Sequence, residues 1–117
     1  YVDNEFCLRC VEKGLVIIEA QEAILIHSLG SITQHSLLWH SCEVTNHDHV
    51  RRYYITRNRM YIYRRYLTTF PQWILMDLRA FLLETIKLVL FERDRRRKIM
   101  SILRGICHGM AGKMGRK

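Results

Sequence analysis

The stretch "HVRRYYITRNRMYIYRRYLTTFP", residues 49–71, decides the fold of this chain. It is rich in Arg and Tyr, and it predicts one helix over about 49–68. Pro71 suits the first turn of a following helix, because the N–H group that proline lacks has no intrahelical partner there. We therefore expect a second helix over 71–91. The tyrosines suit an amphipathic helix whose rings pack inward or meet lipid headgroups. They are Tyr53, Tyr54, Tyr61, Tyr63 and Tyr66.

The second predicted helix is long enough to cross a bilayer, which takes around 20 residues. Four charged side chains interrupt it, and each costs about 2.5–3.5 kcal/mol at the centre of a membrane-spanning helix. They are Asp77, Arg79, Glu84 and Lys87. We therefore expect an amphipathic helix whose apolar face lies against the core or at a membrane interface. That face holds Ile74, Leu78, Phe81, Leu82 and Val89.

The segments on either side of these two helices are shorter. Downstream, "ERDRRRK" (92–98) indicates a charged joint, and "IMSILRGICHGM" (99–110) predicts a last helix. Upstream, "EFCLRCVEKG" (5–14) predicts a short helix that ends at Gly14.

Between the first helix and residue 49 the pattern changes. The β-branched run "LVIIEA" (15–20) and the start of "AILIHSLG" (23–27) predict two short strands. Residues 31–48 show no clear period, so we expect a loop or lid there. Together these elements predict a mostly helical chain with a short two-strand element.

Positive charge is concentrated in the C-terminal part of the chain. Residues 1–50 hold two Lys or Arg against seven Asp or Glu, whereas residues 51–117 hold seventeen against four. The net charge of +8 indicates an anionic partner: nucleic acid, a phosphate-bearing substrate or anionic lipid. The length of 117 residues allows one domain with a modest core. The chain starts at Tyr1 without a signal-peptide pattern, and we expect a fragment of a longer protein.

The stretch "DNEFCLRCVEKG", residues 3–14, allows three interpretations: a redox or zinc motif, an acid/base site, or the polar edge of a helix. Cys7 and Cys10 lack the second ligand pair of a structural zinc site, so we expect packed thiols in a reducing cytosol. Asp3 and Glu5 fall at a helix start, where the dipole favours negative charge. This dipole effect would by itself explain why Asp3 and Glu5 are acidic.

The motifs that follow favour the acid/base interpretation of residues 3–14 over the simple helix start. The order of "VDNEFCLR", "KGLVIIEAQEAILIHSLGS" and "HVRRYYITRNRMYIYRRYLTTFP" resembles the C-terminal end of inverting family-2 glycosyltransferases, in the rhamnosyltransferase-like branch. The basic tail "KIMSILRGICHGMAGKMGR" is also similar to that branch. The resemblance implies that residues 1–48 end a catalytic domain of the GT-A α/β fold and that 49–117 form a basic amphipathic helical extension.

The resemblance also assigns roles to the N-terminal residues. Asp3 falls on the position of the catalytic base, which takes the proton of the acceptor hydroxyl while the nucleotide diphosphate leaves. Glu5 is the alternative base or a contact to the acceptor sugar, and Arg9 would orient this acidic turn through a salt bridge. His27 falls where relatives place a His near the metal and the diphosphate, which implies a divalent cation, Mg²⁺ or Mn²⁺. A satisfied histidine at a strand end is an equal alternative.

Several basic and polar residues are candidates for binding the donor diphosphate, because guanidinium forks match phosphate oxygens. They are Arg9, Arg51, Arg52, Arg57 and Asn58. The alternative is a solvated basic helix face, which we prefer for Arg64 and Arg65.

The function that the resemblance implies is transfer of a sugar such as rhamnose from a nucleotide-sugar donor to a cell-surface glycan or lipid-linked acceptor. The expected location is cytoplasmic, peripheral on the anionic inner face of the cell membrane. No D-x-D motif of the nucleotide-binding half occurs in the chain, so we expect little activity from these residues alone. The alternatives are a basic nucleic-acid-binding module and a membrane-peripheral adaptor. No helix-turn-helix, RNP or zinc spacing supports nucleic acid as the partner.

Overall fold

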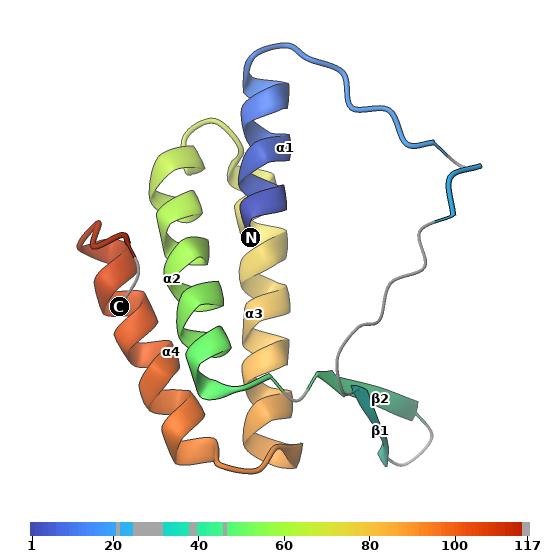
Figure 1. Cartoon of the computed structure of the whole chain (residues 1–117), viewed down its shortest axis with the longest axis vertical. Coiled ribbons are helices and arrows are strands. Elements are labelled where there is room, and N and C mark those ends of the chain that lie inside the picture. Colours follow the sequence, from blue (N-terminus) through green and yellow to red (C-terminus); the bar gives the residue numbers. More distant parts are fainter. Residues whose placement is uncertain (21, 25–31, 38–39, 46, 116–117) are drawn as a thin grey trace.

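The structure is a computed structural model that describes residues 1–20, 22–24, 32–37, 40–45 and 47–115. Within that part of the chain it has four helices and one antiparallel hairpin (Figure 1). The elements are α1 (Val2–Glu12), β1 (Ile32–Leu37), β2 (His40–Thr45), α2 (His49–Tyr66), α3 (Pro71–Phe91) and α4 (Arg95–Met110). The predicted mostly helical character is confirmed.

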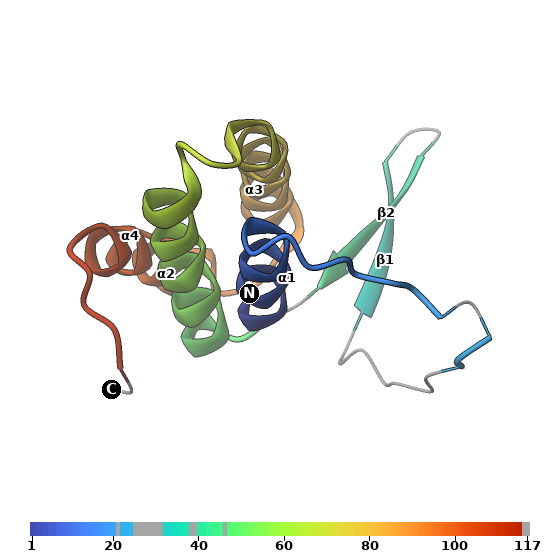
Figure 2. The ribbon, with the colours of Figure 1, turned by 90° about the horizontal axis from the view of Figure 1, so that it is seen from above.

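Helices α2 and α4 run parallel and pack closely side by side (Figures 1 and 2). Two glycines of α4 make this approach possible. A Cβ atom added at Gly105 would lie 2.8 Å from the carbonyl oxygen of Tyr53, and one at Gly109 would lie 2.6 Å from that of Arg57. Because any larger residue would push the helices apart, the helix–helix distance depends on these two positions.

The apolar core lies where α1, α2 and α3 meet (Figure 2). Its buried side chains are Leu8, Ile62, Tyr66 and Ile74, and partly buried aromatic rings surround them. Helix α1 therefore shares a core with two helices of the basic extension. The division into 1–48 and 49–117 stays a prediction.

A buried arginine joins the same three helices. The Arg59 guanidinium lies between the rings of Tyr1 and Phe81, at 4.5 and 4.7 Å from their centroids. Its Nε is 2.9 Å from Oδ2 of Asp77. The Tyr63 hydroxyl donates a hydrogen bond to the same Oδ2, and the Tyr1 hydroxyl donates one to Oδ1. Burial and the bond to Asp77 raise the pKa of Tyr63, so this hydroxyl stays protonated as a donor. The start of α1 is thus anchored to α2 and α3.

Helix α1 ends as the sequence predicts. Gly14 has a φ of +72°, which glycine adopts at no steric cost. Its N–H donates to the carbonyl oxygen of Val11 at 2.9 Å, and the N–H of Leu15 donates to that of Cys10 at 2.9 Å. This pair of bonds is the Schellman motif.

The predicted strand positions are wrong where the structure describes them. Residues 15–20 form no strand, and neither do 23 and 24, while 25–27 lie outside the described residues. The physical reason is that a strand needs a neighbour to complete its backbone hydrogen bonds, which a β-branched run does not supply. The aliphatic side chains of this run are largely exposed, as at Val16 and Ile18.

The predicted loop or lid over 31–48 is also wrong. Strands β1 and β2 pair there in an antiparallel register that places Ile32 opposite Thr45 and Leu37 opposite His40. Cross-strand hydrogen bonds hold such a hairpin together. The prediction rested on hydrophobic periodicity, which does not show whether these bonds form. Strand β2 contacts α3 beside the helical bundle (Figure 1).

Helix α4 begins at Arg95, four residues before the predicted start, so most of the expected joint is helical. Asp94 lies in the corner between α3 and α4 and has a left-handed backbone conformation, with a φ of 56°. Buried Glu92 closes this corner through its two carboxylate oxygens, which pair with Arg52 of α2 at 2.5 Å and Lys98 of α4 at 2.7 Å. The hydrophobic periodicity of the sequence does not reveal such ion pairs between residues that are distant in the chain.

Candidate functional site

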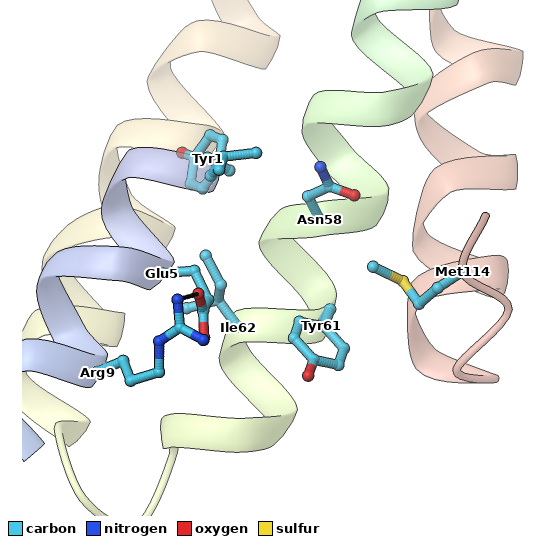
Figure 3. Close-up of a pocket in the computed structure, with 8 residues that line it drawn as sticks. Tyr1, Glu5, Arg9, Asn58, Tyr61, Ile62 and Met114 are labelled. Carbon is cyan, nitrogen blue, oxygen red and sulfur yellow. Dashed lines mark ion pairs between the residues drawn. The ribbon is translucent and has the colours of Figure 1, made fainter. Parts of the chain in front are cut away.

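A cavity of about 400 Å³ opens between α1, α2 and the segment after α4. Figure 3 shows Glu5 and Arg9 on one side, Tyr61 and Asn58 on the α2 side, and Met114 opposite α1. The lining residues are Tyr1, Val2, Glu5, Arg9, Asn58, Tyr61, Ile62 and Met114. Aromatic and apolar walls with a few convergent polar groups are typical of a small-molecule site.

Helical spacing places the polar groups of this cavity. Val2, Glu5 and Arg9 follow one another at intervals of three and four residues, so they share one face of α1. On α2, Tyr61 and Ile62 lie three and four residues after Asn58, so these three also share one face. The facing ridges of two packed helices thus form the cavity walls.

Glu5 is the carboxylate that lines the cavity. One of its oxygens accepts a hydrogen bond from the Tyr66 hydroxyl at 3.3 Å, and the other lies 3.4 Å from the Arg9 guanidinium. The salt bridge expected from Arg9 is therefore present, and it orients Glu5. With both oxygens engaged, the Glu5 carboxylate is held in a fixed orientation at the cavity wall.

Asp3 does not line the cavity. It lies in the first turn of α1 with an exposed side chain. Among the described residues its carboxylate has no hydrogen-bond or ion-pair partner. This carboxylate is therefore open to a molecule that approaches the exposed side of α1.

Arg57 and Asn58 lie together, but only Asn58 lines the cavity. The buried Arg57 guanidinium donates to the Asn58 side-chain oxygen at 3.1 and 3.3 Å, donates to the backbone oxygen of Gly115, and lies 4.9 Å from the Tyr54 ring centroid. Arg57 thus positions Asn58 and holds the segment after α4. A diphosphate would have to replace these contacts.

The remaining two candidate arginines lie at the other end of α2. Arg52 is buried against Glu92, whereas Arg51 is exposed. Partial burial, followed by the charges of Arg51 and Arg52, lowers the pKa of nearby His47. The structure therefore does not bring the five candidate diphosphate-binding residues into one site.

The predicted metal ligand His27 lies outside the described residues. Within the described part of the chain, no group of three or more His, Cys, Asp or Glu side chains is arranged to hold a metal ion. The divalent cation that the resemblance implies therefore stays a prediction.

The cavity also includes residues that the sequence did not indicate. Tyr1, Tyr61 and Met114 line it, although the tyrosines of α2 were expected only to pack or meet lipid. The spacing of Asn58 and Tyr61 was a signal for a shared face. Nothing in the sequence indicated that Met114, after the last helix, comes back to α2.

Comparison with known proteins relates this chain to a glycosyltransferase. A 65-residue part of the chain, 56% of its length, is 32% identical to the dTDP-rhamnosyl transferase RfbF of Shigella flexneri. This part covers 21% of the relative, so the chain spans about a fifth of that protein's length. No protein-family model and no solved structure matches the chain. The chain is thus similar to part of a rhamnosyl transferase.

Proposed function

We propose that this chain is the C-terminal, acceptor-binding part of an inverting GT-A glycosyltransferase. The complete enzyme would transfer a sugar, with rhamnose as the candidate, from a nucleotide-sugar donor to a cell-surface glycan or lipid-linked acceptor. The observation that carries this proposal is the cavity beneath the acidic turn of α1, lined by Glu5, Arg9, Asn58 and tyrosines. The similarity to RfbF supports the same reaction class.

The cavity suits a sugar ring for a chemical reason. Hydroxyl groups of a sugar exchange hydrogen bonds with carboxylate, amide and guanidinium groups, such as Glu5, Asn58 and Arg9. Aromatic rings such as Tyr61 cover the apolar C–H faces. We assign acceptor binding to Glu5 and proton removal to Asp3, whose exposed carboxylate has no hydrogen-bond or ion-pair partner among the described residues.

The cavity proposal predicts a direct binding result. We expect a methyl rhamnoside, used as a probe, to shift the backbone amide NMR signals of α1 and of α2 near Asn58. Glu5→Gln should weaken this binding about threefold or more, because a charged acceptor contributes more than a neutral one. Glu12→Gln is the matched control, since Glu12 is an exposed residue of the same helix that does not line the cavity.

Two results would contradict the acceptor role. One is a set of shifts that avoids both helices. The other is an equal loss of affinity in Glu5→Gln and Glu12→Gln, which would assign the effect to overall charge.

We also propose that α3 contacts an anionic membrane surface from the cytoplasmic side. No helix in the described part of the chain is long and apolar enough to cross a membrane. Helix α3 nevertheless exposes aliphatic side chains on the face opposite the bundle, including Leu75, Leu82, Leu83, Ile86 and Leu90. Arg79 lies on this same face at helical spacing. Apolar side chains with an interspersed cation suit an anionic bilayer interface.

Vesicle sedimentation tests this contact. We expect binding to rise with phosphatidylglycerol content and to fall with salt, because the attraction is partly electrostatic. Ile86→Asn should lower binding about fivefold through lost apolar burial. Val11→Asn, an exposed apolar position of α1, should leave it unchanged. Equal binding to neutral and anionic vesicles would contradict the electrostatic contribution to membrane binding. Equal effects of Ile86→Asn and Val11→Asn would contradict the role of α3.

A further inference from the structure

A second hollow, of about 350 Å³, lies between the start of α2 and the first turns of α4. It is separate from the cavity beside α1, because the two share no lining residue. Its lining residues are His49, Arg96, Arg97, Met100, Ser101 and Arg104.

The three arginines of this hollow form one surface of α4. Arg97 and Arg104 lie seven residues apart with Ser101 between them, and Arg96 lies eight residues before Arg104. These spacings place all three on adjacent ridges of the helix. All three side chains are exposed, and among the described residues none has a hydrogen-bond or ion-pair partner.

Other arginines of the bundle differ sharply from these three. Arg52, Arg57 and Arg59 are buried, and their guanidinium groups are engaged with Glu92, with Asn58 and the backbone, and with Asp77. These arginines stabilise the fold. The three arginines of the hollow, by contrast, are available to an external anion, at positions to which the family resemblance assigns no role.

Among the described residues, no carboxylate lines this hollow, and Asp94 lines a neighbouring hollow together with Arg96 and Arg97. Asp48 lies at its edge, where it pairs with His49 at 2.7 Å. Glu92 is buried and holds both Arg52 and Lys98. Three like charges around one hollow repel one another, and a bound anion would relieve that repulsion.

We propose that this hollow binds a phosphate group through Arg96, Arg97 and Arg104. Guanidinium forks match phosphate oxygens in two-point hydrogen bonds. The Ser101 hydroxyl can donate a further bond, and Met100 provides an apolar side for the remainder of the ligand. The phosphate can belong to a soluble diphosphate or to a lipid headgroup, since both present the same oxygens.

Calorimetric titration of the 117-residue chain with inorganic pyrophosphate tests the site. We expect saturable binding that weakens about three- to tenfold in Arg97→Gln and in Arg104→Gln, as charge-assisted hydrogen bonds are lost. Arg65→Gln is the matched control, because Arg65 is an exposed arginine of α2 that does not line the hollow. All three substitutions remove one positive charge.

Vesicles that contain phosphatidic acid distinguish the two sources of phosphate. Binding to such vesicles that depends on Arg97 and that pyrophosphate does not displace assigns the site to a lipid headgroup. Displacement by pyrophosphate assigns it to a soluble diphosphate, and either result supports the hollow as a phosphate site. An equal loss of affinity in Arg97→Gln and Arg65→Gln would overturn it, as would the absence of saturable binding to both probes. Tight binding of a single-stranded oligonucleotide, with an equal loss of affinity in all three variants, would also overturn it. Such a result would show that anions are attracted by the overall positive charge of the chain and not by the hollow.

Discussion

In an active transferase that contains this chain, we expect Asp3→Asn to lower the rate of sugar transfer by about 10²–10⁴-fold, the usual contribution of a general base. The amide keeps the shape of the side chain but cannot accept the proton of the acceptor hydroxyl. Because the substitution removes an interaction made in the transition state, the turnover number should fall while the donor KM stays nearly unchanged. A radiolabelled or coupled transfer assay at saturating donor measures both quantities.

Glu5→Gln is the internal comparison for this experiment. It should raise the acceptor KM more than it lowers turnover, because Glu5 lines the cavity and both of its oxygens are already engaged. The opposite pattern, with Asp3→Asn nearly silent and Glu5→Gln inactive, would move the base to the carboxylate inside the cavity. If neither substitution changes transfer, the acidic turn only stabilises the start of α1.

Glu92→Gln should destabilise the folded chain by about 3–5 kcal/mol, the usual cost of breaking a buried ion pair by neutralising one partner. Glu92 is 3% exposed and is the shared partner of Arg52 and Lys98, which are 7% and 6% exposed. The amide would remove the negative charge that both buried cations share. Urea unfolding followed by circular dichroism measures the loss as a lower midpoint at an unchanged slope.

Glu84→Gln is the matched control for Glu92→Gln, because it removes the same charge elsewhere on the α3 side of the bundle. The Glu84 side chain is 49% exposed, and its partner Arg59 keeps a second carboxylate, Asp77. We expect a loss of less than about 1 kcal/mol, as for exposed ion pairs. Equal destabilisation by the two substitutions would show that the corner between α3 and α4 does not depend on its buried charges.

Local rules predicted most of the helical structure. The start of α2, the limits of α3 at Pro71–Phe91 and the end of α1 at Gly14 follow from proline and glycine geometry and from helix-forming runs. These features depend on neighbours within a few residues, and such neighbours are visible in the sequence. The early start of α4 was missed because it rests on Glu92, which closes a corner through two other elements.

Strands were predicted in the wrong place for a related reason. The run "LVIIEA" has strong β propensity, yet it forms no strand, whereas the less regular residues of β1 and β2 pair with each other. Propensity reports how well a residue fits a sheet. Whether a partner strand is present is a property of the tertiary structure.

The sequence by itself determined that this protein is a strongly basic, mostly helical chain with an acidic first turn, because composition and short-range periodicity carry that information. Only the tertiary structure decided what each charged group is used for. It buried Arg52, Arg57 and Arg59 as structural side chains, directed Glu5 into a cavity, and left Arg96, Arg97 and Arg104 around an open hollow. The physical reason is that the role of a charge depends on burial and on partners distant in the chain, and packing alone brings those partners together.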